Sequence, residues 1–158
     1  MPRRSTLWKA PLLGLCLATA VHAEEPHLVV GLGAHMTGSN AETTMRYIDE
    51  RRVWALQPVY GLSLGTRGTG YAGAGLAYTW RSAKGWFLRG SVMAGVHRRG
   101  NGTDLGGPML FRSGLDLGLT LDRDMDIGIG VDHRSNARIY TTNPGLNSVS
   151  LFISRRLN

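Results

Sequence analysis

The feature that most constrains the fold is a strict alternation of apolar side chains with small or polar ones over long segments. In residues 109–121, large apolar side chains occupy nearly every odd position, whereas most even positions carry glycine, threonine or a charged residue. A period of two indicates a β-strand with one face in an apolar environment. The segments run about 10 to 13 residues, which exceeds an ordinary strand and is enough to cross a membrane.

Segments of this kind recur along the chain and predict an all-β protein: 28–37, 53–65, 70–81, 86–98, 108–121, 124–136 and 147–157. In transmembrane barrels the connections on one side of the membrane are long and those on the other side are short. The connections of this chain follow that alternation only if one more strand lies between the first two segments, and residues 43–50 are the candidate for it. We therefore predict an eight-stranded antiparallel transmembrane β-barrel, because a closed sheet pairs every backbone group within lipid. We expect a filled polar interior. Charged residues of inward parity should form ion pairs there: Arg89, Arg112, Asp116, Asp126 and Asp132.

The N-terminus has the features of a secretory signal peptide. A basic start is followed by the apolar run 10–21 and by Val21-His22-Ala23, which fits a small-residue cleavage site. We expect a signal peptide of residues 1–23, removed to leave a barrel domain of residues 24–158. The single cysteine would leave with the signal, which excludes disulfides and cysteine-based sites. A secreted chain with scattered basic residues is expected to meet an anionic lipid surface rather than nucleic acid.

A candidate for chemistry continues the lipid-facing stripe of segment 124–136. After Ile127, Ile129 and Val131, the same parity brings His133 and Ser135. Side chains two residues apart on a strand share a face, and a histidine beside a serine can activate its hydroxyl as a nucleophile. The alternation of long and short connections places this end at the outer leaflet. The alternative interpretation is that both are ordinary polar residues at the membrane rim.

The residues around this pair resemble a known family. His133-Arg134-Ser135-Asn136-Ala137, followed by Asn143-Pro144-Gly145, is similar to the lipid A 3-O-deacylase family of outer-membrane barrels, over residues 125–157. The resemblance implies an ester hydrolase that acts on the 3-O acyl chain of lipid A in lipopolysaccharide, in the outer membrane of a Gram-negative bacterium. It also implies that Ser135 is the nucleophile and His133 the general base. The side chain of Asn136 and the backbone N–H groups near Ala137 would form the oxyanion hole.

One position departs from the family pattern. The family carries a glutamate on the last strand as its third catalytic residue, and the matching position here is Asn147. An asparagine can orient a catalytic histidine, as in Cys–His–Asn proteases, but it supplies no negative charge. The alternative function is therefore a non-catalytic outer-membrane barrel, either structural or adhesive, or a decayed relative.

Two arginines and the histidines complete the candidates. Arg134 lies within the motif and Arg138 directly follows it, and both are candidates for contacts with lipid A phosphates, because a guanidinium suits phosphate geometry. Solvated loop residues are the alternative. The histidines show no metal-binding spacing, and the resemblance implies no cofactor.

Overall fold

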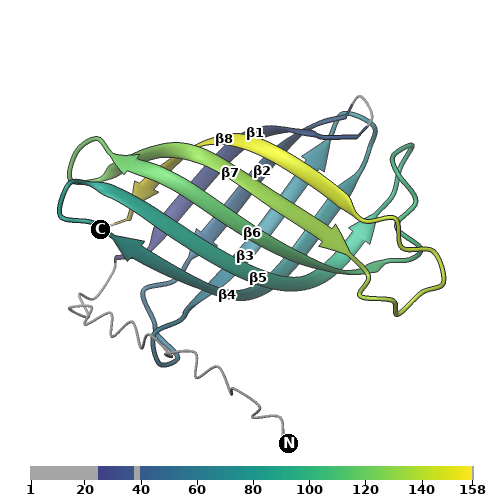
Figure 1. Cartoon of the computed structure of the whole chain (residues 1–158), viewed down its shortest axis with the longest axis horizontal. Coiled ribbons are helices and arrows are strands. Elements are labelled where there is room, and N and C mark those ends of the chain that lie inside the picture. The colour runs from purple at the N-terminus through teal and green to yellow at the C-terminus, as the bar shows by residue number, and fades with distance from the viewer. Residues whose placement is uncertain (1–24, 38–39, 158) are drawn as a thin grey trace, which may run out of the picture.

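The computed structural model describes residues 25–37 and 40–157, and these residues form a closed antiparallel barrel of eight strands (Figure 1). The strands are β1 (His27–His35), β2 (Ala41–Ile48), β3 (Gln57–Gly65), β4 (Gly70–Arg81), β5 (Trp86–Arg98), β6 (Met109–Thr120), β7 (Met125–Ser135) and β8 (Leu146–Arg156). Each strand pairs with its neighbours in sequence, and β1 pairs with β8 to close the sheet. Within these described ranges no helix is long and apolar enough to cross a membrane.

The predicted fold is confirmed, with shifts at two elements. The strand expected at 43–50 is β2, which pairs with β1 and β3. The strand expected from residue 53 begins at Gln57, because residues 53–56 form a tight turn instead. The signal peptide expected at 1–23 lies outside the described residues.

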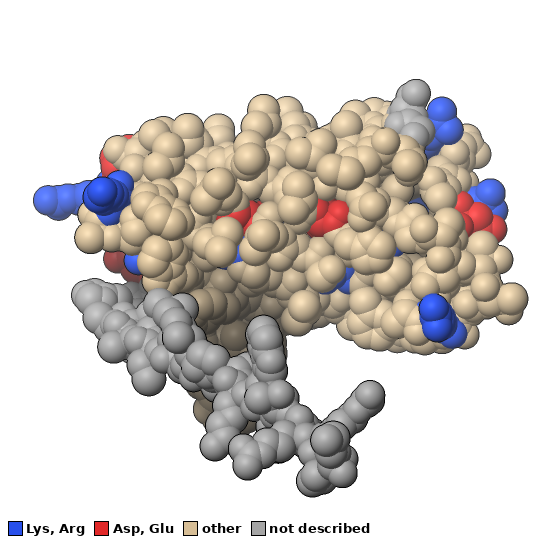
Figure 2. All heavy atoms as spheres, in the orientation of Figure 1, with Lys and Arg blue, Asp and Glu red and all other residues tan. Residues whose placement is uncertain are grey.

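Alternating exposure separates the two faces of the sheet. Ile127, Ile129 and Val131 of β7 are exposed on the outside, whereas Asp126 and Asp132 are buried inside, as their parity predicted. In Figure 2 the middle of the visible face carries few charged atoms, and basic side chains gather at the two ends. An apolar outer surface on a closed sheet is the arrangement in which β-strands cross a membrane.

The interior holds charged side chains in pairs. Arg112 lies 2.8 Å from Asp132, and Arg89 lies 3.6 Å from Asp116, so two of the expected interior pairs are present. Asp126 pairs with Arg81 at 3.0 Å instead of with another member of the predicted set. Pairing is required because an unpartnered buried charge is strongly destabilising.

Candidate active site

His133 lies near the end of β7, between two polar side chains on the neighbouring strands. The strand register places it directly opposite Ser113 of β6 and Asn147 of β8. All three are exposed on the outer face of the barrel, where the side chains nearer the middle of β7 are apolar. The closed sheet thus gathers a polar group from three strands on a surface otherwise suited to hydrocarbon.

Asn147 holds the ring of His133. Its Oδ1 lies 2.8 Å from Nδ1 of the imidazole, across the pairing of β7 with β8. An amide oxygen accepts hydrogen bonds only, which places the proton of a neutral ring on Nδ1. The lone pair then remains on Nε2, and this is the tautomer that a general base requires.

Gly145 packs directly against the same ring. A Cβ at this position would lie 2.9 Å from Cε1 of His133, which is closer than real side chains approach. The backbone of Gly145 also has φ +71°, a left-handed conformation that favours glycine. The loop between β7 and β8 therefore reaches His133 only because this residue has no side chain.

Ser135 is the last residue of β7, two residues beyond His133 on the same face, and it lies opposite Phe111 of β6. The two side chains line one groove of about 400 Å³, whose other lining residues include Phe111, Leu76 and Val92. Within residues 40–157 no hydrogen bond joins Ser135 to His133, whose ring is bonded to Asn147. Catalytic hydrogen bonds often tighten only when substrate is bound. The groove is mainly apolar, which suits an acyl chain.

A strained turn follows Ser135 immediately. Ala137 and Arg138 have φ values of +50° and +65°, and the N–H of Ile139 donates to the carbonyl of Asn136 at 2.9 Å. Left-handed residues other than glycine carry strain, and such strain is frequent at functional sites. The N–H of Asn136 donates to Oδ1 of Asn143 at 3.1 Å, so this group is already bonded.

The position of the Asn136 side chain does not support its expected role as an oxyanion donor. It is fully buried, and its Nδ2 donates to the carbonyls of Leu105 and Thr142 at 2.7 and 2.6 Å. One bond therefore joins the loop after β7 to the loop after β5, and the other spans the loop after β7 itself, so both N–H groups of the amide are used. This leaves the backbone N–H groups of the turn, including that of Ala137, as the candidate donors.

The two candidate phosphate ligands lie in different environments. Arg134 is buried in the interior, where its guanidinium pairs with Glu42 and with Asp132. This position corrects the expectation that Arg134 contacts a lipid phosphate, because even positions of β7 point inward. Arg138 is exposed in the loop after β7. Among the described residues, no group of three or more His, Cys, Asp or Glu side chains is arranged to hold a metal ion.

Comparison with known proteins identifies the family. The family model described as lipid A 3-O-deacylase (PagL) matches residues 28–156, nearly the whole barrel. The chain belongs to the lipid A 3-O-deacylase family. A search of curated protein sequences finds no match.

Solved structures share the fold of this family member. The crystal structure of the outer membrane enzyme PagL superposes with a TM-score of 0.70 at 17% identity, covering 83% of this chain and 99% of that one. A de novo designed transmembrane β-barrel has a TM-score of 0.61 at 10% identity, covering 84% and 95%. Neisserial surface protein A has a TM-score of 0.56 at 11% identity, also covering 84% and 95%. Together with the apolar outer surface, family membership places the chain in the outer membrane.

Sequence reasoning about this family member missed two residues of the site. Ser113 continues the outer stripe of β6 as its polar member, so its parity already indicated that it shares a face with His133. The contact of Gly145 with the His133 ring depends on the path of a loop, and no local sequence pattern specifies that path.

Proposed function

We propose that this chain hydrolyses the ester-linked 3-O acyl chain of lipid A, with Ser135 as nucleophile and His133 as general base. The observation that carries the proposal is the hydrogen bond between Asn147 and His133, 2.8 Å long. It fixes a histidine in the tautomer of a general base on a membrane-facing surface, in an apolar groove that also contains a serine hydroxyl.

The reaction follows from these positions. Nε2 of His133 removes the hydroxyl proton as Oγ of Ser135 attacks the ester carbonyl carbon. The N–H groups of Ala137 and its neighbour in the turn are the proposed donors to the oxyanion. The imidazolium then returns the proton to the sugar oxygen as the C–O bond breaks. Water, deprotonated by His133, then attacks the acyl-serine; the bond between the acyl carbon and Oγ breaks, His133 returns the proton to Oγ, and the fatty acid leaves.

The environment suits an acyl substrate in the outer leaflet. The acyl chain would lie along the groove formed by Phe111, Leu76 and Val92. The polar end of lipid A would face the loops, where Arg138 is the proposed phosphate contact. No cofactor is required for this chemistry.

The asparagine at position 147, in place of the family's glutamate, favours a second candidate function, that of a barrel without catalytic activity. It orients the ring, but it does not stabilise the positive charge that His133 acquires in the transition state. A lapsed enzyme would keep the fold and the hydrogen bond to His133 while lacking turnover.

Covalent labelling of the serine separates the two candidates. We expect a lipophilic fluorophosphonate to modify Ser135 in the folded barrel, as detected by peptide mass spectrometry. The His133→Ala variant should label far more slowly, because the hydroxyl then lacks its base. A wild-type barrel that labels no faster than His133→Ala would contradict the proposed nucleophile.

A further inference from the structure

The turn between β2 and β3 presents an apolar tip away from the barrel. Figure 1 shows this segment projecting beyond the side of the barrel, at the end opposite the loop that follows β7. At its tip the side chain of Trp54 is 93% exposed, and that of Val53 is 54% exposed. No other large hydrophobic side chain of the described residues is exposed to the same extent as Trp54.

Trp54 occupies a backbone position that usually excludes large side chains. Val53 and Leu56 exchange two backbone hydrogen bonds, of 2.8 and 3.2 Å, so Trp54 and Ala55 form a two-residue turn. Trp54 has φ +61°, and Ala55 is not left-handed. Glycine is the favoured residue at the first corner of such a turn. A tryptophan there is strained and unburied, so packing within the barrel does not explain it.

Contacts at the base of the turn hold this tip in place. The N–H of Asp49 donates to the carbonyl of Pro58 at 2.9 Å, and the side chain of Gln57 donates to the carbonyl of Asp49 at 2.8 Å. The carboxylate of Asp49 accepts the N–H of Arg51 at 2.9 Å and also its guanidinium. These side-chain hydrogen bonds from Arg51 hold the pKa of Asp49 below its ordinary value.

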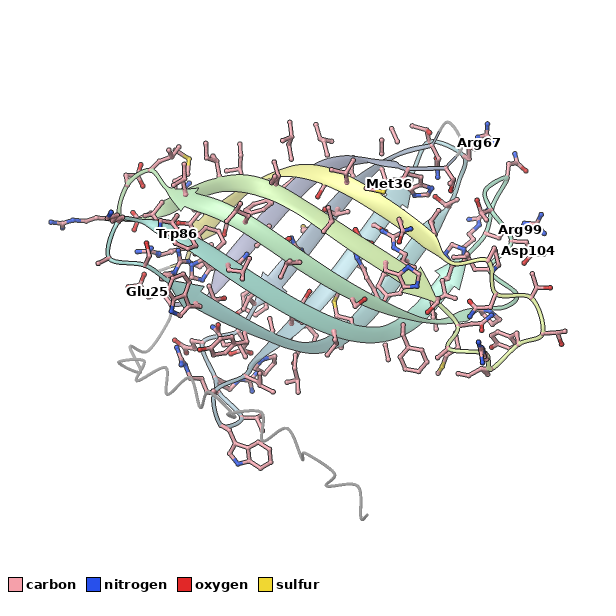
Figure 3. The ribbon with its side chains drawn as sticks, viewed as in Figure 1. Glu25, Met36, Arg67, Trp86, Arg99 and Asp104 are labelled. Carbon is pink, nitrogen blue, oxygen red and sulfur yellow. The ribbon has the colours of Figure 1, made fainter. Side chains whose placement is uncertain are left out.

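The turn continues a row of aromatic side chains at the same end of the barrel. Tyr47 and Tyr60 face each other across β2 and β3, with ring centroids 6.4 Å apart and both rings exposed. Trp80 and Trp86 form an edge-to-face pair with centroids 4.9 Å apart on β4 and β5. Figure 3 places Trp86 at the same end as Glu25, opposite Met36 and Arg67. Aromatic residues in transmembrane barrels mark the membrane–water interface.

We propose that the β2–β3 turn is a membrane anchor, in which Trp54 and Val53 enter the interfacial region of the phospholipid leaflet at the end opposite the candidate active site. An indole has an apolar ring and a polar N–H, and it is favoured at the boundary between headgroups and hydrocarbon. The turn begins two residues after the lipid-facing Tyr47, so its tip is continuous with the surface already in contact with lipid. The formal charges of residues 49–52 cancel, since two are acidic and two are basic. Binding to the membrane therefore depends on the indole rather than on net charge.

Depth-dependent fluorescence quenching tests this anchor. In a variant with Trp8, Trp80 and Trp86 replaced by Phe, Trp54 is the single tryptophan of the chain. The protein is folded into vesicles of phosphatidylethanolamine and phosphatidylglycerol that contain brominated phospholipids. We expect quenching to be strongest with bromine near the headgroup end of the acyl chain, weaker with bromine at the chain end, and unchanged at high salt. Dissolved iodide should quench poorly.

A matched variant that retains only Trp86 calibrates the lipid-facing position. If the single-tryptophan variants fail to fold, the difference between the emission of wild type and of Trp54→Phe reports the same residue. Efficient iodide quenching with no effect of brominated lipid would overturn the proposal. The same result would be expected if the turn served a periplasmic protein instead.

Discussion

Asn147 and His133 face each other across β7 and β8, with the amide oxygen 2.8 Å from Nδ1 of the imidazole. The family's glutamate would offer a similar acceptor together with a negative charge. The difference between asparagine and glutamate that matters for catalysis is therefore the negative charge, which would stabilise the imidazolium form of His133.

Replacing Asn147 by glutamate should increase the rate. The tautomer of His133 stays the same, and the new carboxylate stabilises the charge that develops on the ring. We expect the rate of ester hydrolysis to rise by about 10²-fold, the lower end of what a general acid–base contribution supplies. Release of fatty acid from purified lipopolysaccharide measures the change. Equal rates for wild type and Asn147→Glu, with both proteins active, would show that charge at this position is irrelevant.

Gly145→Ala should disrupt the site more than the fold. The new Cβ would be strained by the positive φ and would collide with Cε1 of His133, so the ring must move. Gly68→Ala is the matched control, because Gly68 has φ +72° and a Cβ added there would meet no atom within 4 Å. Both variants should lose roughly 1–2 kcal/mol of stability from the backbone strain. Only Gly145→Ala should also lose hydrolysis; equal activity in the two variants would contradict the packing role.

Asn136→Ala separates a structural role from a catalytic one. Because the amide joins Leu105 and Thr142, its loss should lower the free energy of unfolding by about 1–3 kcal/mol. Urea unfolding in detergent micelles gives this value. The loss of a true oxyanion donor would instead lower kcat by about 10²–10³-fold at unchanged stability. That outcome would restore the role expected from the sequence.

Arg134 and Arg138 should respond differently to truncation. Arg134→Ala removes the arginine partner of the buried Glu42, whose carboxylate then keeps only His35, 3.6 Å away, so the loss should cost about 3–5 kcal/mol of stability. Arg138→Ala removes an exposed charge, so it should leave stability unchanged and raise KM for lipopolysaccharide. Unfolding curves and initial rates for both variants check the two expectations. A KM unaffected by Arg138→Ala would argue against its contact with phosphate.

The alternation in β6 and β7 predicted both the strands and the facing of their side chains, because each strand has one face toward lipid. β2 was harder to recognise because its outward face includes Ala41 and Thr43 and its inward face ends in the apolar Ile48, which blurs the contrast between the faces. Residues 53–56 continued the alternation in sequence, yet they form a turn that lacks the expected glycine.

The candidate site was predicted to the extent that it follows strand parity. His133 and Asn147 share a face and meet across neighbouring strands, as their odd positions required. Arg134 was expected to contact a phosphate because of its position in the motif, whereas its even position turns it inward, where it is buried and pairs with Glu42. The bonds of Asn136 to Leu105 and Thr142 join two loops, and such non-local contacts leave no periodic signal in the sequence.

Mass spectrometry of lipid A from Gram-negative cells that produce the wild-type chain or Ser135→Ala tests directly whether this barrel is a deacylase. Lipid A from wild-type cells should lose the mass of one ester-linked acyl chain from the 3-O position, whereas Ser135→Ala should leave it intact with the barrel still folded in the outer membrane. Identical lipid A from the two strains, with both barrels folded, would contradict the proposed deacylase activity.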